Sequence, residues 1–471
     1  MSRTALFVAI AGALALLAII VGIPTPQPVP LAPAASGGSL TMQGRLSHPL
    51  VSPGASDLFL SVDLAGIEIP GAERSPVNLA LVIDRSGSMG GYKLEQAKAA
   101  AKHLVRQLRD KDRLAIIHYG SDVQALPAAQ ATAGNRERMI AWIDAIRDEG
   151  GTNIGEALMA ARSHLSGAQS EFKVSRMILI SDGQPTEGMV GHDQLIGLAK
   201  EIRSTGISLS AIGVGTDFNE DLMHAFAEYG SGSYAYLRDA SALATVFQKD
   251  LQQAGTEVAR DVELSIDLPT GVELGEVFGY RATQSGRTVR IPITDFAAGQ
   301  SERVVARLNV RAPEAGSTFE VAALKMRYTD LLKNAPGDAA ATLSASVSKD
   351  LQEVLSKRDK EAVVFGARAL SASNTERAAQ AMERGDRRAA KKYLDVNKVI
   401  LDDADRVAVE GGVPGGVLGG VVGSVLVEGR EEQKKLLNAL SSPSTPEQVS
   451  DQVKAAKSSA LKGMGHIGST Y

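Results

Sequence analysis

Residues 81–89 read Leu81-Val82-Ile83-Asp84-Arg85-Ser86-Gly87-Ser88-Met89, and this stretch decides the fold. An uncharged apolar run ends in one carboxylate and two hydroxyls, which predicts a buried strand followed by a polar loop. Alternate spacing lets a tight loop direct Asp84, Ser86 and Ser88 at one point, while Gly87 relieves crowding. The stretch therefore predicts a cluster of oxygen atoms at the carboxyl end of a strand.

Two further segments carry oxygen atoms in comparable positions. Asp182 follows the apolar run Ile178-Leu179-Ile180 in the segment 178–183, and Thr152 lies in the loop 150–153, before a helix expected at 154–165. In an open parallel sheet, the loops beyond the carboxyl ends of the strands meet in a common crevice. We therefore expect five side chains to converge there: Asp84, Ser86, Ser88, Thr152 and Asp182.

Apolar runs and amphipathic stretches alternate between residues 76 and 254. Strands are expected at 79–83, 114–119, 177–180 and 207–214, with helical stretches such as 93–108 between them. Because the runs are apolar throughout, both faces of the sheet should be covered by helices. The predicted fold class is α/β, with a doubly wound, Rossmann-like, mostly parallel sheet.

The expected ligand set consists of oxygen atoms only, without imidazole or thiolate. Hard oxygen ligands favour Mg²⁺, Ca²⁺ or Mn²⁺ over zinc and copper. Short hydroxyl ligands and few carboxylates suit Mg²⁺ best, and they leave the ion with residual positive charge for an outside carboxylate. The alternative is purely structural, with Ser86 and Ser88 as helix caps and Asp182-Gly183 as a turn.

The three segments resemble the metal-ion-dependent adhesion site of von Willebrand factor A domains. The matching residues are Asp84-Arg85-Ser86-Gly87-Ser88, Thr152 and Asp182. The resemblance implies that Ser86, Ser88 and Thr152 bind the metal directly, and Asp84 and Asp182 directly or through water. Together with Gly279-Tyr280-Arg281 in the following strands, it also suggests a bacterial envelope protein of the chloride-channel-like type. The H-E-x-x-H protease motif of the animal chloride-channel regulators is missing from the sequence, so protease activity is not expected.

Composition narrows the functions further. The 471 residues carry a net charge of −4, which gives no reason to expect a nucleic-acid partner. There are no cysteines, so thiol catalysis and thiolate zinc sites are excluded. We interpret His118, at the end of an apolar run, as a satisfied core or rim residue, and Trp142, the only tryptophan, as packing.

The N-terminus predicts export. Residues 1–23 contain one basic residue, Arg3, followed by an uncharged apolar run close to the roughly 20 residues that cross a bilayer. This favours an uncleaved anchor over a cleaved signal peptide, and residues 24–38 form a Pro/Ala-rich linker. The expected location is the cell envelope, outside the cytoplasmic membrane.

The remaining segments flank the α/β domain. Residues 39–75 and 258–347 have strand patterns, and we expect them to form one β-sandwich with the α/β domain inserted. Residues 350–406 predict a helical hairpin turned at Gly385. Residues 411–424 predict a Gly-rich linker, with a membrane-dimerising helix as the alternative, and 430–471 a polar tail with one or two weak helices.

We expect a binding protein and not an enzyme, one that holds an Asp or Glu of a protein partner through the bound ion. Two alternatives remain open. One is a metal-dependent hydrolase, which requires a general base near the ion. The other is a structural assembly factor in which the metal only stabilises the domain.

Overall fold

The computed structural model describes residues 35–36, 38–70, 74–168, 171–182, 184–215, 218–409, 417–441, 446–467 and 470. The predicted anchor, 1–23, lies outside these residues, as does the predicted linker up to residue 34. Within the described part of the chain, no helix combines the length and the apolar character that a membrane span requires.

The α/β domain is built on a six-stranded sheet with the order β10-β9-β8-β5-β6-β7. Every neighbouring pair is parallel except β6 and β7. Its strands are β5 (Val77–Asp84), β6 (Arg113–Tyr119), β7 (Val123–Gln130), β8 (Val174–Ser181), β9 (Ile207–Val214) and β10 (Ser231–Leu237).

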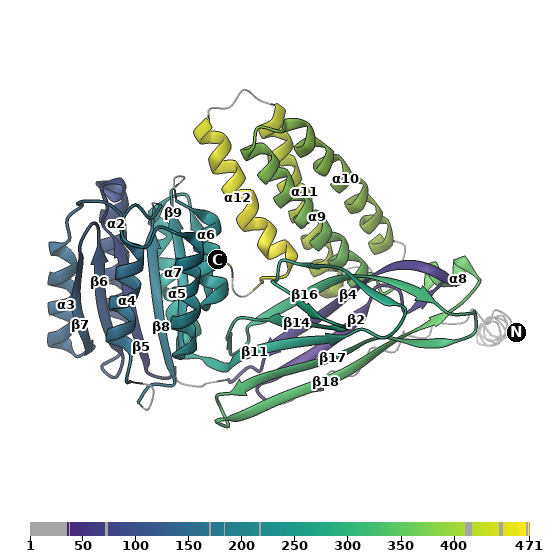
Figure 1. Ribbon diagram of the computed structural model, residues 1–471, viewed down its shortest axis with the longest axis horizontal. Coiled ribbons are helices and arrows are strands. Elements are labelled where there is room, and N and C mark those ends of the chain that lie inside the picture. Colours follow the sequence, from purple (N-terminus) through teal and green to yellow (C-terminus); the bar gives the residue numbers. More distant parts are fainter. Residues whose placement is uncertain are drawn as a thin grey trace, which may run out of the picture. The chain divides into compact units, whose positions relative to one another are not determined.

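Helices cover both faces of this sheet (Figure 1). Alternate residues of β5 supply the two cores: Leu79 and Leu81 pack on one side and Ala80 and Val82 on the other, all fully buried. The helices are α2 (Tyr92–Gln107), α3 (Ala133–Ala145), α4 (Ile154–Leu165), α5 (His192–Ser204), α6 (Glu220–Tyr229) and α7 (Leu243–Gly255), with short 3₁₀ turns η1 (Gly87–Met89) and η2 (Ala240–Ala242).

Two mainly antiparallel sheets enclose a separate core of Leu, Val and Ile side chains. One has the order β1-β2-β4-β16-β12 and the other β13-β14-β11-β17-β18-β3, with β15 paired to β11. The first contains β1 (Ala35–Ser36), β2 (Leu40–Leu46), β4 (Gly54–Gly66), β16 (Ser301–Ala312) and β12 (Val272–Phe278). The second contains β13 (Thr283–Ser285), β14 (Thr288–Pro292), β11 (Glu257–Asp267), β17 (Thr318–Asp330), β18 (Ala335–Val347), β3 (Leu50–Val51) and β15 (Phe296–Ala297).

Strand pairing shows that the α/β domain is inserted in this sandwich. β4 precedes the α/β domain in sequence and β16 follows it, yet the two pair along their whole length, from Gly54 opposite Ala312 to Ala65 opposite Ser301. The N-terminal strands thus gain a partner sheet that they could not form alone. The predicted fold class is confirmed, including the doubly wound sheet, the additional β-sheets and the C-terminal helices.

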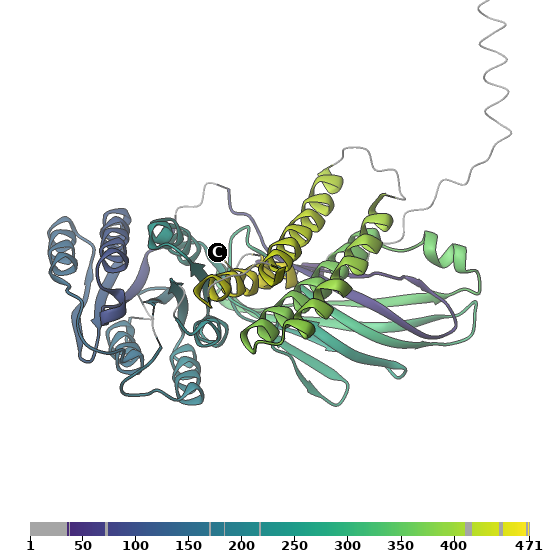
Figure 2. The ribbon, with the colours of Figure 1, turned by 90° about the horizontal axis from the view of Figure 1, so that it is seen from above.

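The C-terminal region is a bundle of four packed helices (Figure 2). They are α9 (Lys360–Glu383), α10 (Arg387–Val409), α11 (Val417–Ser441) and α12 (Pro446–Met464), after the short α8 (Leu351–Ser356). Gly385 stands between α9 and α10 with a φ of 75°. α9 packs on β4 and β16, and α12 contacts β10 of the α/β domain.

The structure corrects two expectations for this region. Residues 417–424, expected in a linker, begin α11, because Leu426 is buried against Val364 and Leu401 and the helix extends back from this contact. Residues 430–471 are not a polar tail, since Leu436 and Val453 are buried in the bundle core. Packing between helices outweighs the low helix propensity of glycine here.

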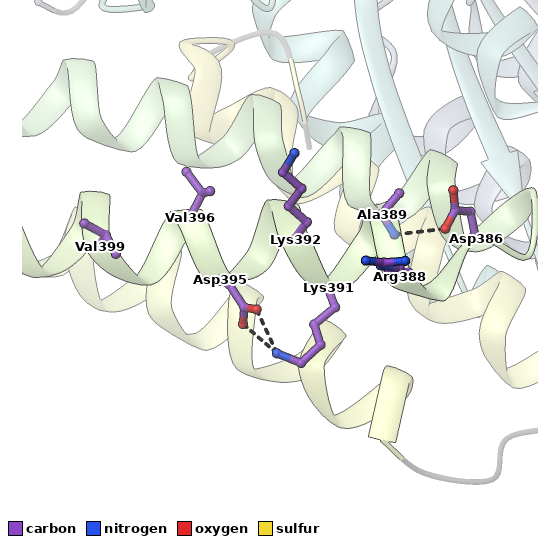
Figure 3. Close-up of a pocket in the computed structure, with 8 residues that line it drawn as sticks. All are labelled: Asp386, Arg388, Ala389, Lys391, Lys392, Asp395, Val396 and Val399. Atoms are coloured by element: carbon purple, nitrogen blue, oxygen red, sulfur yellow. Dashed lines mark hydrogen bonds and ion pairs between the residues drawn. The ribbon is translucent and has the colours of Figure 1, made fainter.

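One face of α10 is solvent-exposed and forms an open hollow of about 710 Å³ (Figure 3). Lys391 and Asp395 are paired along this face at 2.7 Å, and the side chain of Asp386 accepts from the Ala389 N–H at the start of the helix. Val399 is 67% exposed beside them. Two of the charged residues on this face, Lys391 and Asp395, are therefore paired with each other.

Candidate metal centre

Asp84 ends β5 and is completely buried. Its Oδ1 accepts from the Ser86 N–H at 2.9 Å, and its Oδ2 accepts from Ser181 Oγ at 2.7 Å and from Tyr119 OH at 3.4 Å. Burial raises the pKa of this carboxyl to about 6, although the hydrogen bonds from Ser86 and Ser181 oppose the shift. Asp84 is thus fixed in place by groups on three neighbouring strands or their loops.

A chain of oxygen contacts connects the first loop to the end of β8. Ser86 Oγ lies 3.2 Å from Ser88 Oγ, and Ser88 Oγ donates to Asp182 Oδ1 at 2.8 Å. Asp182 is completely buried, whereas Ser88 is exposed. Four of the five expected residues therefore lie together at the carboxyl ends of β5 and β8, with an opening at Ser88.

Thr152 lies in a loop that backbone hydrogen bonds hold against the first. The Gly87 N–H donates to the Gly150 carbonyl at 3.1 Å, and the Glu149 N–H donates to the Arg85 carbonyl at 2.8 Å. Thr152 itself is 4% exposed, and its N–H donates to Thr186 Oγ1 at 2.9 Å. The structure thus brings the loop of Thr152 to the site. Within the described part of the chain, it defines no contact between the Thr152 hydroxyl and the other four side chains.

Three residues that sequence reasoning did not assign to the site support it. Ser181 and Tyr119 hydrogen-bond to Asp84, and Lys93 Nζ contacts Asp182 Oδ2 at 2.5 Å. Ser181 could have been found from strand register, because it follows Ile180, which pairs with Ile83. Lys93 gave no such signal, since a lysine in the first turn of an amphipathic helix is ordinarily solvated.

The ion pair with Lys93 shows that Asp182 already attracts a cation. The lysine side chain reaches from α2 and is 29% exposed, while the carboxylate is fully buried. Its Nζ also lies beside Gly215 at the end of β9, where a Cβ would come within 3.2 Å of it. One positive charge is therefore held at the rim of the oxygen cluster.

The donor set fits a hard divalent cation. It offers carboxylate oxygens from Asp84 and Asp182 and hydroxyls from Ser86 and Ser88, with the loop of Thr152 alongside. Among the residues that the structure describes, no group of three or more His, Cys, Asp or Glu side chains is placed to bind a metal. A site at this position therefore depends on serine and threonine hydroxyls, which suit Mg²⁺ better than softer metals.

Comparison with known proteins identifies the domain that carries these residues. The model of the von Willebrand factor type A domain family matches residues 78–249. The Escherichia coli (strain K12) protein YfbK is 28% identical over 294 residues, which are 61% of this chain and 50% of YfbK. The chain thus spans about half the length of this relative.

Two solved structures share the fold over nearly the whole chain. A von Willebrand factor type A protein from Catenulispora acidiphila superposes with a TM-score of 0.64 at 17% identity, covering 92% of this chain and 98% of that one. The ArnB paralog VWA2 from Sulfolobus acidocaldarius has a TM-score of 0.56 at 19% identity and covers 91% and 99%. Residues 78–249 of this protein are therefore a von Willebrand factor type A domain.

Proposed function

We propose that the domain binds one divalent cation, preferably Mg²⁺ with Ca²⁺ or Mn²⁺ as substitutes, and uses it to hold an Asp or Glu of a protein partner. The residues that would hold the ion are Asp84, Ser86, Ser88, Thr152 and Asp182. The bound ion supplies a Lewis-acidic position to which a carboxylate from outside can bind. The observation that carries the proposal is the continuous contact from Ser86 through Ser88 to Asp182.

The protein's own residues prepare this position. Burial of Asp84 and Asp182 prevents water from screening their charge, which strengthens their attraction for a cation. Ser181 and Tyr119 fix the orientation of Asp84, and Ser88 leaves the site open to solvent. A partner carboxylate can therefore approach at Ser88.

We propose a binding role and not a catalytic one. Two titratable groups next to the oxygen cluster are engaged, because Lys93 is paired with Asp182 and Tyr119 is hydrogen-bonded to Asp84. Burial also raises the pKa of Tyr119 well above its usual value, which makes it a poor general base at neutral pH. The proposed location remains the cell envelope, outside the cytoplasmic membrane, with residues 1–23 as the anchor.

Ser88→Ala is expected to weaken Mg²⁺ binding at least tenfold, since it removes one oxygen donor from an exposed position and little else. Isothermal titration calorimetry of the full chain measures this directly. Asp182→Asn should give a still larger loss, because it removes a buried negative charge. Ser163→Ala, an exposed serine on α4 of the same domain, is the matched control and should bind Mg²⁺ as the wild type does.

Partner binding is tested with the same variants. Immobilised full-length protein should retain a partner from envelope extract in Mg²⁺ and lose it in chelator or with Ser88→Ala. A partner that remains bound in chelator, while the melting temperature falls, would instead support the assembly-factor alternative. Divalent-dependent turnover of simple esters or phosphate esters would favour the hydrolase.

Lys93→Met is expected to increase Mg²⁺ affinity roughly tenfold, about 1.4 kcal/mol. The lysine ammonium competes with the ion for Asp182 Oδ2, and methionine keeps the apolar stem without the charge. Lys102→Met removes the same charge from the same helix, where it pairs with Asp144, and should change the affinity less than twofold. Weaker binding by Lys93→Met would show that the lysine positions Asp182 instead of competing for it.

A further inference from the structure

A cavity of about 200 Å³ lies beside the first loop, between the end of β6 and the end of α3. It begins one residue from Asp84, at Arg85, whose N–H donates to the Tyr119 carbonyl at 2.8 Å. The polar side chains that line it belong to Arg85, His118, Gln124, Trp142, Arg147 and Glu149. None of these is a proposed metal ligand, so the cavity is a separate feature of the domain.

Three of the residues that line this cavity each have one buried polar atom without a hydrogen-bond partner in the described part of the chain. These atoms are Nε of Arg85, Nδ1 of His118 and Nε1 of Trp142. Arg85 is 2% and His118 6% exposed. Buried polar groups in native proteins are almost always paired, so three unpaired atoms around one cavity indicate a missing partner. His118 was expected to be a satisfied core or rim residue and Trp142 to pack, but Nδ1 of His118 and Nε1 of Trp142 are unpaired.

The chemistry of these atoms defines the partner. The N–H groups of arginine and tryptophan can only donate, and neutral histidine donates from one ring nitrogen. The rings of His118 and Trp142 are close, with centroids 5.9 Å apart. Nε of Arg85 and Nε1 of Trp142 therefore require acceptor oxygens, and Nδ1 of His118 donates to the same group in the tautomer that carries its proton there.

Two arginines, Arg85 and Arg147, lie at the cavity. Arg85 is paired with Asp122 and with Glu149, whose side chains are 57% and 79% exposed. Arg147 donates to the backbone carbonyls of Asp144 and Ile146. Counting Arg85 and Arg147 as positive and Asp122 and Glu149 as negative, the charges at the cavity sum to zero, so its hydrogen-bond donors and not its net charge select the ligand.

We propose that this cavity binds a small carboxylate, whose oxygens accept from Arg85 Nε, His118 and Trp142 Nε1. The volume is below the range of about 300–1,000 Å³ that is typical of larger ligands, which limits the occupant to a small acid or to the acidic side chain of a peptide. A phosphate would bring up to two negative charges beside Asp122 and Glu149, whereas a carboxylate brings one. The site does not require the metal, so it stands or falls separately from the proposed function.

Trp142 reports on this cavity alone, because it is the only tryptophan in the chain. Full-length protein in chelator is titrated with sodium acetate, glutarate and inorganic phosphate, with sodium chloride at equal ionic strength as reference. We expect acetate and glutarate to change the tryptophan emission saturably. A response identical to that of chloride means that the cavity holds water only, and it overturns the proposal, as does saturation by phosphate alone.

Two variants locate the response. His118→Leu replaces a buried ring by an apolar side chain of similar size, and Arg147→Gln removes a charge at an exposed position. Each should weaken the carboxylate affinity at least fivefold. Arg138→Gln, an exposed arginine on α3 outside the cavity, should leave the affinity within twofold. Unchanged affinity in both His118→Leu and Arg147→Gln would place the binding elsewhere and refute the assignment.

Discussion

Replacing Arg176 by methionine is expected to lower the free energy of unfolding by about 3–5 kcal/mol. Arg176 lies on β8, the strand that leads to Asp182, and its side chain is 4% exposed. Its guanidinium contacts Asp250 Oδ1 at 3.1 Å and Ser208 Oγ at 3.1 Å, and it pairs with Glu257. One cation thus joins β8 to α7 and to the first residue of β11.

The expected cost comes from the carboxylates that would remain. The side chains of Asp250 and Glu257 are 1% and 3% exposed. Removal of Arg176 would therefore leave two buried carboxylates without the positive charge that they contact. Burial already raises the pKa of Glu257 to about 7, and Arg176 opposes that shift. In Arg176→Met the pKa of Glu257 should rise further. Protonation of Glu257 then limits the loss in the free energy of unfolding. The destabilisation should consequently be larger at pH 8 than at pH 6.

Chemical denaturation followed by circular dichroism at the two pH values measures this effect. Arg162→Met breaks a pair with Glu201 in which the side chains are 30% and 61% exposed, and it should cost no more than about 1 kcal/mol. Adding Glu257→Gln to Arg176→Met should restore part of the stability. A loss below about 1 kcal/mol in Arg176→Met would show that water reaches this cluster and solvates the carboxylates.

The periodicity of the sequence was sufficient to predict the α/β domain and where its loops meet. The fully apolar run at 81–83 predicts a strand buried on both faces, and β5 supplies residues to both cores. Because parallel strands end at the same edge, the position of Asp182 beside the loop of Asp84 followed from the order of the segments. The three contacts among Asp84, Ser86, Ser88 and Asp182 are thus the part of the site that local pattern can predict.

Features that depend on long-range packing were missed. The direction of Lys93 toward Asp182 depends on how α2 lies over the sheet, which no local pattern specifies. The same holds for Trp142, whose ring nitrogen is buried and unpaired beside His118. α11 is a helix because Leu426 has a buried site between α9 and α10, although the preceding glycines favour a flexible chain.

Lowering the pH from 6.5 to 4 is expected to weaken the junction where α6, the end of β12 and the segment after α12 meet. His224 on α6 and His466 after α12 face each other there, with ring centroids 6.2 Å apart. His466 also stacks on Tyr280 at 4.1 Å, and its Nε2 lies 2.7 Å from the Gly279 carbonyl oxygen. Burial lowers the pKa of both histidines to about 4.

The direction of this pH effect on stability follows from proton binding. An unfolded chain takes up protons at these histidines near pH 6.5, whereas the folded protein does so only near pH 4, so acid favours the unfolded state within this window. A shift from 6.5 to about 4 corresponds to roughly 3 kcal/mol for one histidine. Asp221 beside His224 and Glu228 beside His466 oppose the shifts without cancelling them. The contribution of the two histidines to the free energy of unfolding is therefore fully present above pH 6.5 and is lost as the pH falls toward 4.

The double variant His224→Phe and His466→Phe separates this effect from other titrations. Asp84 and Glu257 have raised pKa values, so the folded state binds protons more readily at these carboxyls, and their contribution to stability rises as the pH falls. The contributions of Asp84 and Glu257 are the same in the wild type and the variant, so they cancel when the two proteins are compared.

Phenylalanine keeps the ring packing but does not titrate, so the variant should lose clearly less stability than the wild type between pH 6.5 and 4. His192→Asn, at a half-exposed histidine, should behave as the wild type does. Equal acid sensitivity in the double variant and the wild type would mean that water enters the junction and that the two rings are protonated there without cost.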